Sequence, residues 1–98
     1  MTRQASLLVN DQPIELDYFV QGFLDHTIGG MVAALEGIGE IESMDISIEG
    51  NEVTINVNNA PVAIKPFVSE IFRNTIAGML SSLKGVSEVN KVKMAIKR

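Results

Sequence analysis

Apolar and polar residues follow the same pattern in the two halves of the chain. Residues 53–57 (Val-Thr-Ile-Asn-Val) alternate apolar and polar side chains, as a strand with one buried face does. Across residues 19–35, and again across 67–83, apolar residues recur at helical spacing, which predicts two amphipathic helices. The full pattern predicts strands at 5–9, 41–49, 53–57 and 89–97, and helices at 17–36 and 65–84.

The likeness of the two halves extends to residue identity. Residues 9–50 align without a gap onto 57–98 at a constant offset of 48, and thirteen of the aligned pairs are identical. The identical residues are mainly apolar, glycine, proline and turn residues, so the duplication describes a scaffold and no reactive group. We expect one domain, residues 1–98, built by gene duplication from two internal repeats at about 5–50 and 53–98.

The predicted elements follow the order strand, helix, strand, strand, helix, strand. Gly50-Asn51 separates the second and third strands by two turn residues, which predicts a hairpin. This order favours an α+β sandwich of the ferredoxin-like type, β-α-β-β-α-β, with two helices on one face of a four-stranded antiparallel sheet. The expected core residues are Phe19, Phe23, Ile28, Met31, Leu35, Ile46, Ile48, Ile55, Val57, Phe67, Ile71, Phe72, Met79, Leu83 and Ile96.

The segment after the first strand of each half leaves a second architecture open. If Asp11-Gln12 is a two-residue turn, Val9 lies opposite Ile14 and both apolar side chains share one face. The second half allows the same turn at Asn59-Ala60. Each half would then be hairpin, helix, strand, and the fold would contain two ββαβ units with six strands in total.

Composition narrows the class of protein. The chain has no cysteine, which excludes disulfides, thiolate metal sites and thiol nucleophiles. Its apolar runs are too short for a membrane span, and the N-terminal residues reach Asp11 too soon for a secretory apolar region. We expect a cytoplasmic protein that does not bind membranes. Because 46% of its residues are hydrophobic, we also expect part of the apolar surface to be buried between subunits.

The net charge of −4 conceals a reversal between the halves. The first 49 residues hold nine acidic residues and one basic residue, whereas the remainder hold three acidic and seven basic residues. In an antiparallel helix pair that crosses near Gly29 and Ala77, acidic side chains of the first helix would face basic side chains of the second. The expected contacts between the repeats are Asp25 with Lys84 and Glu36 with Arg73.

The sequence contains no recognisable catalytic constellation. His26 is the only histidine and lies at a polar or border position of its helix, and the serines and threonines have no companion base. The acidic residues Glu40, Glu42 and Asp45 lack the spacing and the glycine of a calcium loop. We therefore expect no enzymatic activity.

Leu35-x-Gly37-Ile38 and Leu83-x-Gly85-Val86 resemble the helix-to-strand corner of heavy-metal-associated and similar ferredoxin-like domains. Those domains bind metal through two cysteines, which this chain lacks, so the resemblance carries no metal site. We expect no metal and no other cofactor.

A basic C-terminal strand makes nucleic acid a candidate partner. Lys91, Lys93, Lys97 and Arg98 cluster there. The acidic net charge, the lack of an aromatic stacking platform on the outward strand positions and the absence of an RNP motif argue against it.

The expected architecture also fits a small-molecule regulatory domain of the ACT type, by analogy of fold alone. The candidate ligand loops are Asn10-Asp11 and Asn58-Asn59, although asparagine is also common in tight turns. The apolar arc of each helix is wider than a single core requires. The sequence therefore favours a non-enzymatic interaction or assembly module that associates with itself or with a protein partner, and an ACT-like ligand-binding domain is the alternative.

Overall fold

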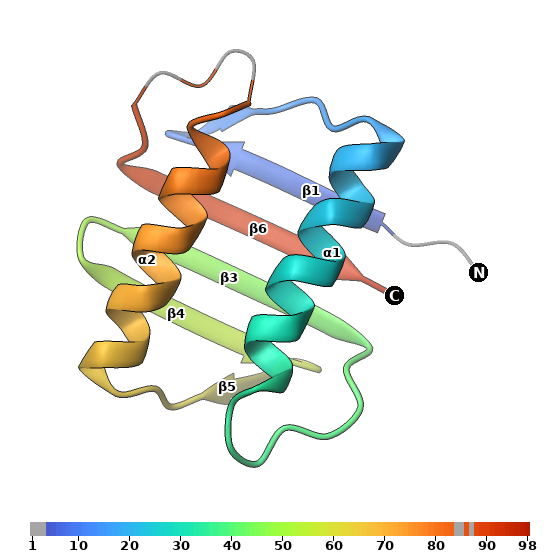
Figure 1. The fold of residues 1–98 in the computed structure, drawn as a ribbon, viewed down its shortest axis with the longest axis vertical. Helices are drawn as coiled ribbons and strands as arrows, with labels where there is room; N and C mark the ends of the chain where they lie inside the picture. Colours follow the sequence, from blue (N-terminus) through green and yellow to red (C-terminus); the bar gives the residue numbers. More distant parts are fainter. Residues whose placement is uncertain (1–3, 84–85, 87) are drawn as a thin grey trace.

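Two helices lie side by side across one face of a single antiparallel sheet, which gives a small α+β fold (Figure 1). The computed structural model describes residues 4–83, 86 and 88–98. The elements are β1 (Gln4–Val9), β2 (Gln12–Pro13), α1 (Tyr18–Ala33), β3 (Ser43–Glu49), β4 (Glu52–Val57), β5 (Ala60–Val62), α2 (Pro66–Leu80) and β6 (Lys91–Lys97). The sheet has six strands in the order β2-β1-β6-β3-β4-β5.

Short hairpins precede both helices, so the described order in each half is hairpin, helix, strand. This order contains β2 and β5, which the β-α-β-β-α-β expectation lacked, and it has the element order of the ββαβ alternative. The turns are Asn10-Asp11 (φ 51° and 65°) and Asn58-Asn59 (φ 52° and 66°). Positive φ at both central residues is the type I′ geometry that suits the twist of a hairpin, and Asn and Asp tolerate it.

The expected hairpin register was wrong by two residues. The turn occupies Asn10-Asp11 instead of Asp11-Gln12, so Val9 pairs with Gln12 and not with Ile14. In β4 and β5 the same shift pairs Ile55 with Val62. A shift by two residues keeps each side chain on its expected face, because successive side chains alternate between the faces.

Every long ladder of the sheet joins the two halves of the chain. β1 pairs with β6, β4 pairs with β3, and β3 pairs with β6 in the centre. The central strands are thus the ones that follow the helices, whereas the ferredoxin-like order places the strands that precede the helices in the centre. The ladder registers agree at the offset of 48: Leu7 pairs with Met94, and Ile55 pairs with Ile46. The expected hairpin across Gly50-Asn51 is present between β3 and β4.

The hydrophobic core lies between the sheet and the helices. Residues at intervals of four carry the sheet-facing ridge of each helix: Leu24, Ile28 and Val32 in α1, and Phe72, Ile76 and Leu80 in α2, all of which are buried. The strands add alternate residues: Leu7, Val9, Met44, Ile46, Ile48, Ile55, Val57, Val92, Met94 and Ile96.

Four residues that were expected in the core are exposed: Phe19, Phe23, Phe67 and Ile71. Four others, Met31, Leu35, Met79 and Leu83, are only partly buried. The reason is geometric, since a helix resting on a flat sheet buries one ridge and parts of its flanks, whereas the apolar arc of these helices also includes the side that points away from the sheet.

Both helices begin where the sequence predicts. The Asp17 carboxylate caps α1 by accepting a hydrogen bond from the Val20 amide at 2.8 Å. The C-terminal end of α1 at Ala33 is earlier than the expected residue 36, because short i to i−3 hydrogen bonds tighten the chain there and Gly37 (φ 85°) redirects it. The second helix also ends earlier than the expected residue 84: α2 stops at Leu80, and the amides of Ser82 and Leu83 form i to i−3 hydrogen bonds beyond it. Lys84 and Gly85 lie outside the described residues.

Candidate functional site

The Asn10 side chain of the first candidate loop is held by the backbone before β6. Its Oδ1 accepts hydrogen bonds from the amides of Asn90 (3.0 Å) and Lys91 (2.9 Å). Its Nδ2 donates to the carbonyl oxygen of Glu88 at 2.7 Å. The neighbouring Asp11 forms an ion pair with Lys91 at 3.3 Å. The loop therefore fixes the start of a central strand with its own polar atoms.

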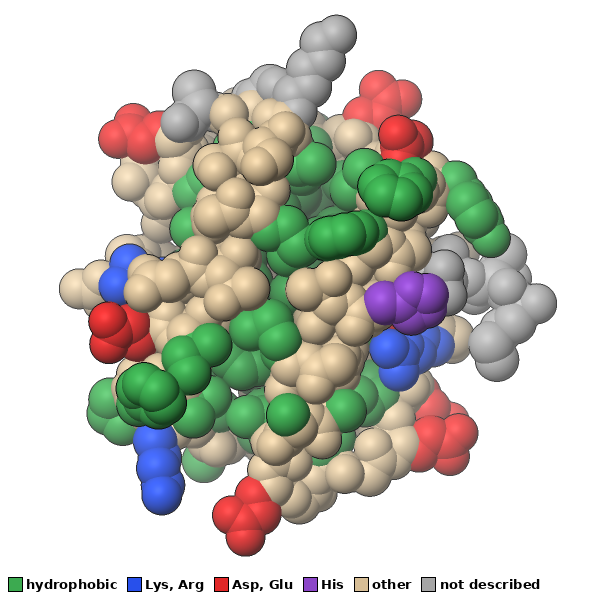
Figure 2. All heavy atoms as spheres, viewed as in Figure 1, with side chains coloured by type: hydrophobic (Ala, Val, Ile, Leu, Met, Phe, Trp, Pro, Cys, Tyr) green, Lys and Arg blue, Asp and Glu red, His purple; other side chains and the backbone are tan. Residues whose placement is uncertain are grey.

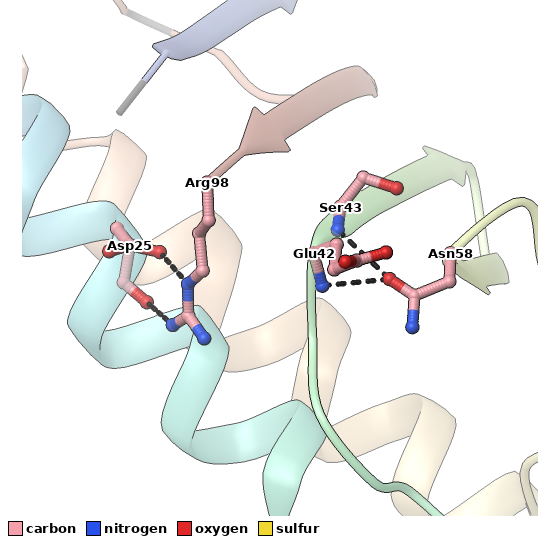
Figure 3. A network of polar contacts seen from close by, with 5 residues as sticks. All are labelled: Asp25, Glu42, Ser43, Asn58 and Arg98. Carbon is pink, nitrogen blue, oxygen red and sulfur yellow. Dashed lines mark hydrogen bonds and ion pairs between the residues drawn. The ribbon is translucent and has the colours of Figure 1, made fainter. Parts of the chain in front are cut away.

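Asn58 repeats this arrangement in front of β3 (Figure 3). Its Oδ1 accepts from the amides of Glu42 (2.8 Å) and Ser43 (3.0 Å), and its Nδ2 donates to the carbonyl oxygen of Glu40 at 2.9 Å. These partners precede those of Asn10 by 48 residues. Because β1 and β4 run in opposite directions, the two asparagine loops lie at opposite ends of the sheet and do not form a common pocket (Figure 1).

Asp25 is the one described polar side chain in the buried class, and Arg98 holds it (Figure 3). The Arg98 Nε donates to Asp25 Oδ1 at 2.7 Å, and Nη2 donates to the Asp25 carbonyl oxygen at 3.3 Å. The Arg98 amide also donates to the Glu42 carbonyl oxygen at 2.9 Å, which continues the pairing of β6 with β3 beyond the end of β6. This ion pair fastens α1 to the end of β6.

Gly29 makes room for the guanidinium group. A Cβ at Gly29 would overlap Arg98 Nη2 and would also meet the methyl group of Met44. In the repeat alignment Gly29 corresponds to Ala77 and Arg98 corresponds to Gly50, so the arrangement exists in one half only. That paired asymmetry, a glycine against an alanine and an arginine against a glycine, is the only trace of this contact in the sequence.

The structure places the expected contacts between the repeats differently. The helix face that contains Asp25, Gly29 and Val32 is buried, and Asp25 and Gly29 meet Arg98 and Met44 of the sheet layer instead of α2. Lys84 lies outside the described residues. Glu36 and Arg73, both described, form no ion pair with each other. The opposite charges of the two halves nonetheless meet, through Asp25 with Arg98 and Asp11 with Lys91.

The sheet face turned away from the helices is mainly polar. It carries Ser6, Asp45, Ser47, Thr54 and Lys93 at alternate positions of the strands, and the described strands contain no aromatic residue that could stack on a base. The basic residues of the last strand are in part paired, because Lys91 and Arg98 have acidic partners within the chain.

The apolar surface of the molecule lies on the helices. The exposed large hydrophobic residues among those described are Tyr18, Phe19, Phe23, Phe67 and Ile71, and all five belong to α1 or α2. Four of the five aromatic residues in the chain are thus exposed, and only Phe72 is in the core. Phe19 is 73% exposed and Phe67, at the equivalent position of the second half, is 72% exposed.

A hollow between the helices continues this apolar surface. It has a volume of about 440 Å³ and is lined by Phe19, Phe23 and Leu24 of α1 and by Met79 and Leu83 from the other side. The Phe19 and Phe23 rings lie 6.0 Å apart at an angle of 42°, so the two rings support each other. Figure 2 shows hydrophobic side chains between the helices and over one end of each, with most charged side chains near the periphery of this face.

The remaining features define no reactive site. Among the described residues, no three His, Asp or Glu side chains converge as metal ligands. In the same part of the chain, neither helix is long and apolar enough to cross a membrane. No protein-family model matches the chain, and no curated protein or solved structure matches it.

Proposed function

We propose that this chain is a non-enzymatic assembly module that associates with itself through its helical layer. The observation that carries this proposal is the exposure of Tyr18, Phe19, Phe23 and Phe67 on one face, in a chain that has a single aromatic residue in its core. Aromatic side chains contribute large apolar areas to protein interfaces, and contiguous exposed apolar patches mark interaction sites.

The arrangement of charges supports the same surface. In the described helices, charged side chains other than Asp25, which binds Arg98, are confined to Glu70 and Arg73. An apolar centre with charged residues toward its rim is the usual anatomy of a protein interface. The asparagine loops offer less for recognition, because the side-chain amides of Asn10 and Asn58 bind the chain's own backbone.

We further propose that the domain arose from two copies of one ββαβ unit. Supporting this are the constant offset of 48, the matching registers of the β1–β6 and β3–β4 ladders, and the equivalent hydrogen bonds of Asn10 and Asn58. Fusion of two interlocked units makes the association of the halves permanent. It leaves the helical layer as the apolar surface available for further assembly.

Light scattering and sedimentation over a range of protein concentrations test the assembly function. The wild-type chain should gain mass with concentration, and the double variant Phe19→Ser/Phe67→Ser should remain monomeric with an unchanged far-UV CD spectrum. Leu8→Ser is the matched control, since Leu8 is a half-buried apolar residue on the opposite face of the sheet. A wild-type chain that stays monomeric at the highest attainable concentration would refute the proposal.

A further inference from the structure

We propose that a second copy of this chain covers the helical layer, with α1 of one copy packed antiparallel against α2 of the other about a twofold axis parallel to the helices. This inference rests on the proposed function and specifies its geometry. Three features of the surface support it: its shape, the positions of its residues along the helix direction, and the charges at the ends of the helices.

The helix face that points away from the sheet carries a phenylalanine and a glycine at the same spacing in both helices. Phe19 and Gly30 lie eleven residues apart in α1, as do Phe67 and Gly78 in α2, and eleven residues complete about three turns, so each pair shares one helix face. All four residues are exposed. A Cβ at Gly30 or Gly78 would meet no atom within 4 Å, so contacts within the chain do not require glycine at either position.

Glycine in the middle of a helix lowers helix stability relative to alanine. Its presence at two equivalent and exposed positions is explained when another backbone or an aromatic ring approaches closely. Each helix therefore presents an exposed phenylalanine, Phe19 or Phe67, and about three turns further on an exposed glycine over which an aromatic ring can lie. The surface is self-complementary, as a twofold interface between identical chains requires.

The helices of one copy run antiparallel, so the start of α1 lies at the same end of the layer as the end of α2 (Figure 1). Phe19 indeed shares a hollow with Met79 and Ser82. A twofold rotation about an axis parallel to the helices does not change the position of a residue along the helix direction. It therefore brings Phe19 against the Gly78 region of the second copy, and Phe67 against the Gly30 region.

The charges at the helix ends select this orientation over the alternative. Exposed Glu36 follows α1, and exposed Lys65 precedes α2 at the same end of the layer. Packing α1 against α2 of the second copy places Glu36 near Lys65, an attractive pair that occurs twice by symmetry. The other twofold arrangement packs α1 antiparallel on itself and places Asp17 near Glu36, which is repulsive.

The sheet edges are poor alternatives for self-association. The edge strands β2 and β5 have two and three residues, and both contain a proline, Pro13 or Pro61, that donates no hydrogen bond. Short strands and edge prolines prevent the pairing of sheets from two molecules. The helical layer remains as the surface on which a second copy can bury apolar area.

Cysteine cross-linking tests the arrangement, because the chain has no cysteine of its own. His26→Cys and Asn74→Cys place single thiols at exposed, equivalent positions near the middle of α1 and α2. The two variants are co-expressed as differently tagged chains and oxidised, and each is also oxidised alone. We expect a disulfide-linked dimer that contains one chain of each type, with little product from either variant alone.

The other outcomes separate the two proposals. Cross-links within each single variant, or a dimer that forms without cross-links, would overturn the α1-on-α2 arrangement while leaving the assembly function in place. A monomer with a native CD spectrum would overturn both. As a second measurement, Glu36→Lys should raise the dimer dissociation constant about two- to tenfold, and Glu36→Lys/Lys65→Glu should restore it. Equal weakening in the single and double variants would contradict the pairing of these residues.

Discussion

The Arg98 guanidinium reaches past Gly29 to hold the Asp25 carboxylate, with Nε and Oδ1 2.7 Å apart. This contact joins the acidic first half of the chain to the basic second half at a buried position. Attraction between oppositely charged repeats was expected between the helices, but the structure provides it between α1 and the end of β6. The contact leads to two predictions about stability.

Arg98→Ala should lower the free energy of unfolding by about 1–3 kcal/mol, because the mutation removes a charged hydrogen-bond donor from a buried carboxylate. The loss should be smaller than the roughly 3–5 kcal/mol of a fully buried pair, since the Arg98 side chain is 32% exposed. Urea unfolding followed by CD measures the change. Lys97→Ala, at an exposed neighbouring residue, is the control, and an equal effect of both variants would contradict the role of the ion pair.

Gly29→Ala should stabilise the fold in the Arg98→Ala background but not in the wild-type background. In the Arg98→Ala background the new methyl group no longer overlaps the guanidinium, so the gain in helix propensity should stabilise the fold by about 0.5–1 kcal/mol. In the wild-type background the methyl group displaces the guanidinium from Asp25, and that gain should be cancelled or reversed. A stabilisation of equal size in both backgrounds would show that Gly29 is not needed to accommodate Arg98.

Asn10→Ala and Asn58→Ala should each destabilise the fold by about 1–3 kcal/mol, because the hydrogen bonds to the start of a central strand are lost and alanine must adopt positive φ. The glycine variants lose the same hydrogen bonds without the backbone strain, so they should be about 1 kcal/mol more stable than the alanine variants. Urea midpoints provide the comparison. Equal stability of the glycine and alanine variants would rule out a contribution from the backbone conformation.

Phe72→Ala and Phe67→Ala should differ widely although both residues lie in α2. Phe72 is 2% exposed, so its truncation should cost about 3–5 kcal/mol. Phe67 is 72% exposed, and its truncation in the monomer should change stability by less than about 1 kcal/mol. Thermal unfolding at low protein concentration, where association is absent, gives both values. Similar losses for the two variants would contradict the described burial.

Fragments 1–50 and 51–98 should fold only together, because every long strand ladder joins the two halves. Each fragment alone retains little beyond one short hairpin and a helix, which are marginal in water. Their opposite net charges favour the mixed complex over pairs of like fragments. The CD spectrum of the mixture should differ from the sum of the separate spectra, and a native-like spectrum of either fragment alone at low concentration would contradict the prediction.

Sequence patterns predicted only part of the structure of the candidate sites. The sequence singled out Asn10 and Asn58 as candidate ligand positions and placed each turn one residue later, whereas the structure places both asparagines inside the turns at positive φ. Their side-chain partners lie about 80 residues away for Asn10, and no local pattern reveals such contacts. Arg98 and Gly29 were likewise visible only as departures from the repeat. The difference between the two halves at these positions shows an asymmetry, but it does not show that Arg98 binds Asp25.

The sequence by itself determined the two helices and the four long strands, because side-chain periodicity separates helices from strands and Gly50-Asn51 fits the hairpin between β3 and β4. It left the short strands β2 and β5 open. It also determined which strand residues face the core, since alternation fixes the face whatever the register. Only the tertiary structure decided which strands are neighbours, because an alternating strand can pair equally well with several others. It also decided that Phe19 and Phe67 are exposed. Their burial depends on how much of each helix the sheet can cover, and the sheet covers less than the apolar arc of these helices.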